Sequence, residues 1–126
     1  MIDHVSIAVR NLKSAEAFYT MLLATLGMSK LREWPDAAVG YGKKYPEFWI
    51  NKRTAMDAIT DDDGVHICLR APDKSAVNAF HAAALKSGGR TDGSPGLRAE
   101  YHGGYYAAFV KDPDGNRIEA VTFVKD

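Results

Sequence analysis

The stretch His4-Val5-Ser6-Ile7-Ala8-Val9 decides the fold, because a variant of it returns 62 residues later, from His66 onward, as His66-Ile67-Cys68-Leu69-Arg70. In both stretches aliphatic side chains alternate with polar or small ones, which is the period of a half-buried β-strand. A recurring strand of this kind indicates an internal repeat, and a repeat determines the whole architecture.

The segments that follow the two strands agree in the same register. The first predicted helix begins at about Asn11 and ends at Gly27, and the second begins at about Asp73 and ends at Gly88-Gly89. Asn and Asp are favoured before the first turn of a helix, and glycine is favoured just past its end. Each half therefore opens with a strand followed by a helix.

Short strands complete each half. Asp112-Pro113-Asp114-Gly115 has Pro and Gly at positions suited to a tight hairpin turn before the last strand. Each half is thus predicted to be a βαβββ unit, and residues 54–63 form a polar connector between the halves 1–53 and 64–126. The further strands are expected at 28–33, 37–43 and 47–52 in the first half and at 97–101, 105–111 and Asn116 to Lys125 in the second.

The length of the chain favours one α+β domain over residues 1–126, of which 46% are hydrophobic. A single half of about 60 residues buries too little surface to be stable alone. We expect the two βαβββ modules to pack side by side and to form a curved, open mixed sheet around a central cavity.

Charge and composition exclude several classes of function. Sixteen basic residues cancel sixteen acidic ones, which removes the electrostatic basis for binding nucleic acid or an anionic membrane. The apolar runs are far shorter than the ~20 residues that cross a bilayer, and the N-terminus lacks the pattern of a signal peptide. The single cysteine, Cys68, cannot form an internal disulfide. The expectation is a cytoplasmic protein that acts on a small molecule.

Three polar residues stand out on the predicted open face of the sheet. If the aliphatic positions face the helices, His4 and His66 lie on the opposite face, and the repeat places them near one axis. Glu119 lies in an apolar last strand and needs a partner, since an unpaired buried carboxylate costs several kcal/mol. Two imidazoles and one carboxylate can hold a divalent ion and leave positions open. Taken singly, each residue is equally explained as an ordinary polar residue with local partners.

Three segments carry a family resemblance: Ile2-Asp3-His4-Val5-Ser6-Ile7-Ala8-Val9 with Ala17-Phe18-Tyr19, then Val65-His66-Ile67, and last Phe109-Val110-Lys111-Asp112-Pro113-Asp114-Gly115-Asn116-Arg117-Ile118-Glu119. They resemble the vicinal oxygen chelate superfamily, which is the glyoxalase, bleomycin-resistance and extradiol dioxygenase group. His4, His66 and Glu119 match the metal ligands of that family one by one. The resemblance spans essentially the whole chain and implies one divalent cation (zinc, nickel, manganese or iron) and a homodimer.

The resemblance implies a metal-dependent enzyme that activates a small oxygen-bearing substrate by Lewis-acid chemistry, as a lyase, an isomerase or an extradiol dioxygenase. Glyoxalase I enzymes have a second glutamate in the fourth strand of the first half, where the repeat places Trp49. Glu47 takes that position only if the alignment of the first half with the second is shifted by two residues. Because Trp49 cannot bind a metal or accept a proton, the sequence favours dioxygenase or addition chemistry over glyoxalase I activity.

Further residues are candidates for roles beside the metal. Tyr105 and Tyr106 are candidate proton donors, and alternation directs only one of them inward. Trp49, Cys68 and His102 are candidate substrate-binding residues. Packing of the tyrosines at the sheet edge, packing of Trp49 in the core and a buried inert thiol at Cys68 are the competing interpretations.

Two other functions fit the same fold. One is a metal-free binding module of the bleomycin-resistance type, which the intact ligand set argues against. The other is a thiol transferase of the fosfomycin-resistance type, which uses the same three ligands.

Overall fold

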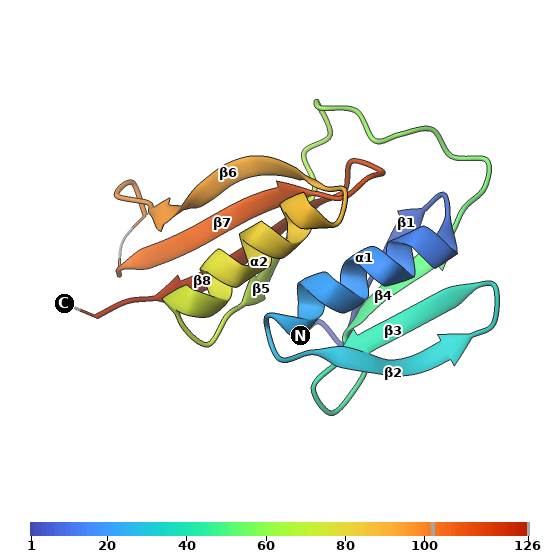
Figure 1. The fold of residues 1–126 in the computed structure, drawn as a ribbon, viewed down its shortest axis with the longest axis horizontal. Coiled ribbons are helices and arrows are strands. Elements are labelled where there is room, and N and C mark those ends of the chain that lie inside the picture. Colours follow the sequence, from blue (N-terminus) through green and yellow to red (C-terminus); the bar gives the residue numbers. More distant parts are fainter. Residues whose placement is uncertain (102, 126) are drawn as a thin grey trace.

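A computed structural model describes residues 1–101 and 103–125 and confirms the repeated βαβββ arrangement (Figure 1). The first module contains β1 (Val5–Val9), α1 (Leu12–Ala24), β2 (Ser29–Trp34), β3 (Ala38–Gly42) and β4 (Phe48–Lys52). The second contains β5 (His66–Arg70), α2 (Lys74–Lys86), β6 (Arg90–Leu97), β7 (Tyr105–Lys111) and β8 (Arg117–Phe123). No helix or strand lies between β4 and β5.

Each module folds into its own mixed sheet, with strand order β1-β4-β3-β2 in the first and β5-β8-β7-β6 in the second. The central pairs β1–β4 and β5–β8 are parallel, and the remaining pairs are antiparallel. No strand pairing joins the two sheets within the described residues. The structure therefore has two separate four-stranded mixed sheets where the sequence predicted one joined sheet.

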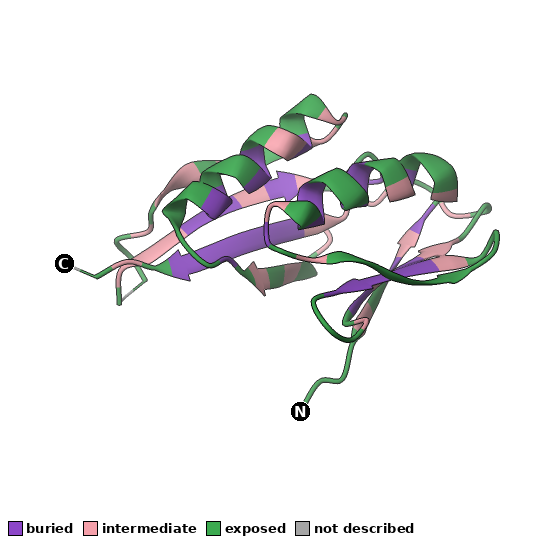
Figure 2. Ribbon diagram, turned by 60° about the horizontal axis from the view of Figure 1, so that its bottom comes forward, coloured by how far each residue is buried: buried purple, intermediate pink, exposed green. Residues whose placement is uncertain are grey.

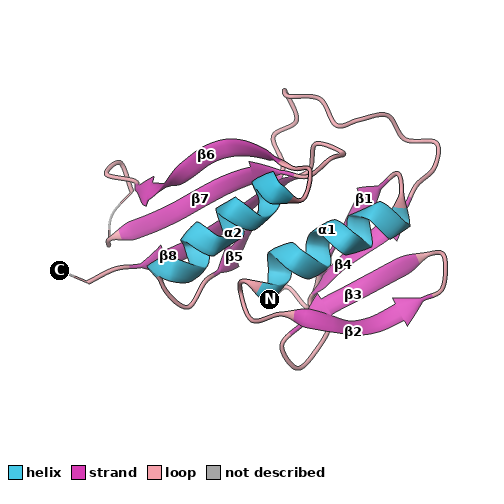
Figure 3. Ribbon diagram, in the orientation of Figure 1, coloured by secondary structure: helices cyan, strands magenta, loops and turns pink. Residues whose placement is uncertain are grey.

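The two helices lie side by side on the same side of the molecule (Figures 1 and 3). The Asn11 side chain accepts a hydrogen bond from the Ser14 N–H, and the Asp73 side chain accepts one from the Ala76 N–H, so each helix begins with the predicted cap. Gly27, just past α1, has a positive φ of 81°, which glycine adopts without strain. Each helix has 13 residues, and in the described part of the chain none is long and apolar enough to cross a bilayer.

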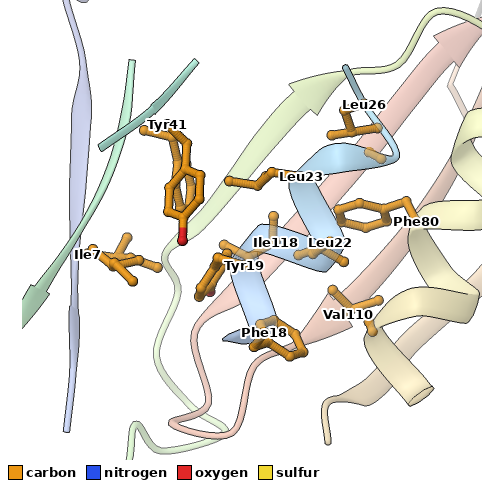
Figure 4. Packing of buried hydrophobic residues seen from close by; sticks show 14 of the residues in the cluster. Ile7, Phe18, Tyr19, Leu22, Leu23, Leu26, Tyr41, Phe80, Val110 and Ile118 are labelled. Carbon is orange, nitrogen blue, oxygen red and sulfur yellow. The ribbon is translucent and has the colours of Figure 1, made fainter. Parts of the chain in front are cut away.

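One hydrophobic core runs between the helices and the sheet faces that they cover (Figure 4). Phe18 and Leu22 of α1 and Phe80 of α2 are almost fully buried, and side chains of both modules contribute to the same cluster. In β5 the exposed residues His66, Cys68 and Arg70 alternate with the partly buried Ile67 and Leu69, which pack against the core, whereas the edge strand β2 is exposed along its whole length (Figure 2). The core thus fixes one face of each sheet and leaves the other free for a site.

The turn Asp112-Pro113-Asp114-Gly115 connects the second module to the first. The buried Asp112 carboxylate accepts a hydrogen bond from the Tyr19 hydroxyl of α1 at 2.6 Å. Asp114 Oδ1 accepts hydrogen bonds from Arg10 Nε at 2.7 Å and from the Arg10 N–H at 3.1 Å. The side chain of Asn116 donates to the Ala8 carbonyl at 2.9 Å. We call these contacts the intermodule clamp.

The predicted strand at 97–101 is wrong, because the strand is β6 and follows α2 directly. Its sequence, Arg-Thr-Asp-Gly-Ser-Pro-Gly-Leu, contains turn-forming residues that obscure the strand pattern. The segment pairs only with β7, at the edge of the sheet, and its register shifts between Thr91 and Gly93 and again between Gly93 and Gly96. An irregular edge strand tolerates Pro and Gly, which a central strand does not. The other strands lie within one or two residues of the predicted bounds.

We predict that Tyr19→Phe lowers the free energy of unfolding by about 1–3 kcal/mol, because the buried Asp112 carboxylate loses a donor. Urea denaturation measures this change. Tyr106→Phe is the matched control, since its hydroxyl bonds Asn78 at an exposed position, and it should cost less than about 1 kcal/mol. Equal losses in the two variants would contradict a special role for the clamp.

Candidate functional site

The second sheet brings together four predicted site residues on its open face. In β8, Ile118 and Ala120 belong to the hydrophobic core, so the intervening Glu119 points to the opposite face. Glu119 pairs in register with Cys68 of β5. His66 precedes Cys68 by two residues on the same face, and Tyr105 reaches Glu119 from β7.

Glu119 is the centre of this group. It is 2% exposed, and its Oε1 lies 3.0 Å from His66 Nε2. The Tyr105 hydroxyl donates a hydrogen bond to Glu119 Oε2. Burial, followed by the hydrogen bond to Glu119, raises the pKa of Tyr105 above its usual value, so its phenol keeps its proton at neutral pH. The buried carboxylate thus has a partner on each oxygen.

Cys68 lies beside this pair. Its Sγ is 3.9 Å from the Tyr105 hydroxyl. Desolvation by the surrounding protein, and then the negative charge of Glu119, raise the pKa of the Cys68 thiol to about 11. Since the thiolate is the nucleophile, this cysteine is a poor nucleophile at neutral pH in this environment.

His4 lies just before β1, on the N-terminal segment that extends away from the helix-covered side (Figure 2). Its side chain is half exposed, and its Nδ1 lies 2.6 Å from Asp3 Oδ1. His4, His66 and Cys68 line one pocket of about 350 Å³. Among the residues that the structure describes, no three His, Cys, Asp or Glu side chains are gathered as metal ligands. The chain therefore pairs His66 with Glu119 and places His4 at the same pocket, outside that pair.

The side chains of His4, His66 and Glu119 offer atoms of the types that bind divalent cations. For His66 and Glu119, the distance between these atoms also suits one shared ion. Imidazole nitrogen and carboxylate oxygen are the donors of zinc and of non-haem iron sites. Two donors at ~2.1 Å from one ion, roughly 90–110° apart, are separated by about 3.0–3.4 Å. The 3.0 Å between His66 Nε2 and Glu119 Oε1 falls in this range.

The first sheet has a tryptophan at the position equivalent to Glu119. Ser6 pairs with Trp49 in β1 and β4, as Cys68 pairs with Glu119 in β5 and β8, so the register does not slip toward Glu47. The Trp49 ring lies against Gly40, where an added Cβ would come within 2.8 Å of it. The first module therefore presents an indole where the second presents a carboxylate.

Trp49 also lines a second pocket, of about 340 Å³, together with His4. Trp34 and Tyr45 line this pocket as well, and the sequence analysis missed both. The pairing of Trp34 with Ala38 across the β2–β3 turn is the signal that could have placed Trp34 on this face, once the register was known.

Of the two candidate tyrosines, Tyr106 is the one that does not face the open side. Its hydroxyl donates to Asn78 Oδ1 of α2 at 2.7 Å, and Lys74 lies over its ring. Tyr106 therefore faces the helix, and Tyr105 faces the open side. The remaining candidate, His102, lies outside the described residues.

Comparison with known proteins identifies the relatives of this chain. Residues 1–120 match the family model of the Glyoxalase/Bleomycin resistance protein/Dioxygenase superfamily. A glyoxalase/bleomycin resistance protein from Albidiferax ferrireducens T118 is 30% identical, with a TM-score of 0.79 over 94% of this chain and 95% of that one. A glyoxalase I mutant from Zea mays is 21% identical, with a TM-score of 0.70 over 94% of this chain and 44% of that one, and shows the fold alone. No curated protein matches the chain at a significant level.

We predict slow alkylation of Cys68 by iodoacetamide at pH 8, because a thiol with a pKa of about 11 is only about one part in a thousand ionised there. The rate should rise with pH up to about 11. Glu119→Gln removes the nearby charge and should speed the reaction at pH 8. The single cysteine makes mass spectrometry an unambiguous readout. Wild-type labelling as fast as that of a free thiol would contradict the environment described.

Proposed function

The chain belongs to the Glyoxalase/Bleomycin resistance protein/Dioxygenase superfamily, and from that premise we propose that it is a metal-dependent enzyme acting on a small oxygen-bearing substrate. The observation that carries the proposal is the buried Glu119 carboxylate at 3.0 Å from His66, on an open sheet face. His66, Glu119 and His4 would hold one divalent cation. When bound, such a cation supplies Lewis-acid activation of substrate oxygens.

The residues around the metal ligands have separate tasks. Tyr105 orients Glu119 through its hydroxyl and carries a proton at neutral pH, so it is the candidate donor to a substrate oxyanion. Cys68 stays a neutral thiol on the wall of the His4–His66 pocket. Trp49 offers an apolar surface for the rest of the substrate in the neighbouring pocket.

The reaction type follows from Trp49. A glyoxalase I isomerisation needs a carboxylate in the first module as well, and the register places an indole there. A site with three protein ligands and open positions favours extradiol dioxygenation or addition to a small substrate.

We also propose a homodimer in which a second copy covers the open faces. Two large hydrophobic side chains of the open faces, Trp34 and Phe123, are exposed in the single chain. His4 directly precedes β1 and its side chain is half exposed, so that it could meet His66 and Glu119 of a second copy. A twofold interface would supply two such sites.

One observation favours a second candidate function, a metal-free binding module. Trp34, Tyr45 and Trp49 line the pocket beside His4, and aromatic walls bind apolar or cationic ligands without a metal. In that case His66 and Glu119 are a hydrogen-bonded pair and nothing more.

We predict that the purified protein binds one divalent cation per chain and that His66→Ala loses it, because the buried carboxylate alone is a weak ligand set. Elemental analysis measures both. His81→Gln is the matched control, since His81 bonds Thr91 on the helix side, away from the pocket, and should keep the metal. No metal in the wild type would favour the binding module. For a protein that does bind metal, oxygen uptake with a catechol panel separates dioxygenation from addition.

We predict that mixing the His4→Ala and His66→Ala variants restores metal binding in about a quarter of the sites, if the ligands come from two copies. Half of the randomly formed dimers then contain both variants, and each of these has one intact site. Unfolding and refolding the mixture before elemental analysis ensures exchange. No recovery, from a mixture that light scattering shows to be dimeric, would place all three ligands on one chain.

A further inference from the structure

The imidazole of His4 is held by a chain of contacts that reaches across the first module. Its Nδ1 lies 2.6 Å from Asp3 Oδ1. The Tyr45 hydroxyl donates to both oxygens of the same carboxylate, at 2.7 and 2.9 Å. An ionised carboxylate only accepts hydrogen bonds, and both of its oxygens here face a donor. The nitrogen that faces it must therefore carry the proton.

The loop that carries Tyr45 has little freedom. It joins β3 and β4, and the Glu47 N–H donates to the Tyr41 carbonyl at 2.9 Å to close it. A Cβ at Gly42 would lie 1.8 Å from the Tyr45 carbonyl oxygen, so the loop folds onto a backbone that only glycine permits. The Glu47 carbonyl in turn accepts from the Val5 N–H at 2.9 Å, next to His4. The N-terminal segment is thus fastened to this loop on both sides of His4.

Nδ1 of His4 is thus engaged, and Nε2 has no hydrogen-bond partner among the described residues. A histidine that donates Nδ1–H to a carboxylate has one tautomer and one ring orientation, and it presents a more basic Nε2. His66 also directs its Nε2 toward Glu119. In the pocket lined by His4 and His66, both imidazoles would then use Nε2 as the metal-binding nitrogen.

We propose that Asp3 and Tyr45 are positioning residues: Tyr45 fixes the Asp3 carboxylate, and Asp3 fixes the His4 ring with Nε2 as its metal-binding nitrogen. This inference rests on the proposed function, because it takes His4 as a ligand. The carboxylate holds the ring in one tautomer before any metal arrives, so binding needs no reorientation.

The first test needs no metal. Long-range ¹H–¹⁵N NMR correlations of the labelled protein, at a pH where its histidines are neutral, report which His4 nitrogen carries the proton. The wild type should show the Nδ1–H tautomer. Asp3→Ala should shift the ring to the Nε2–H tautomer that predominates in free histidine. An Nδ1–H tautomer that persists in Asp3→Ala overturns the proposal.

The second test measures affinity for cobalt(II) by its visible absorption bands. Asp3→Ala should weaken binding by about 10–100-fold, as loss of such outer carboxylates does. Asp3→Asn keeps an acceptor oxygen and should recover part of the loss, and Tyr45→Phe should weaken binding by less than about tenfold. Tyr106→Phe is the matched control and should bind like the wild type, since it removes a tyrosine hydroxyl on the helix side.

Two failures are distinguishable. A wild type that binds no cobalt contradicts the proposed function itself, and the metal role of Asp3 with it. A wild type that binds cobalt and loses affinity in His4→Ala, but keeps it in Asp3→Ala, overturns the positioning role alone.

Discussion

The relative position of the two modules depends on a buried carboxylate more than on sheet pairing. No strand ladder joins the sheets within the described residues, so the helix packing and the intermodule clamp define how the halves meet. Asp112 is 1% exposed and accepts hydrogen bonds from Tyr19 and Asn116. Burial raises the pKa of Asp112 above its usual value. A costly buried group with this many partners specifies a single docking geometry.

Local signals in the sequence were enough to predict the modules. Asn11, Asp73 and the terminating glycines define helix ends through contacts within a few residues, and the alternation in β1 and β5 defines strands in the same way. The strand β6 was missed because its Gly and Pro residues are tolerated only through its edge position, which is a property of the assembled sheet. Local sequence patterns therefore predict individual helices and strands more securely than they predict which strands lie side by side in a sheet.

The site required information that lies far apart in the chain. The direction of Glu119 followed from the core placement of Ile118, and the choice between Tyr105 and Tyr106 followed from the register of β7 with β8. The ring of His4 is held by the neighbouring Asp3 carboxylate, which in turn accepts hydrogen bonds from Tyr45, 42 positions away from Asp3. Residue types indicated the chemistry, whereas pairing and packing decided which atoms meet.

The two modules share one fold but have different side chains on their open faces. The position that holds Glu119 in one sheet holds Trp49 in the other, while the backbone pairing around both is the same. Because each sheet completes its own hydrogen bonds, a substitution on one open face leaves the ladder of the other intact. Within the described residues the modules meet through their helices and the intermodule clamp and share no strand ladder, so the open face of one sheet can change its side chains while the backbone pairing of the other is kept.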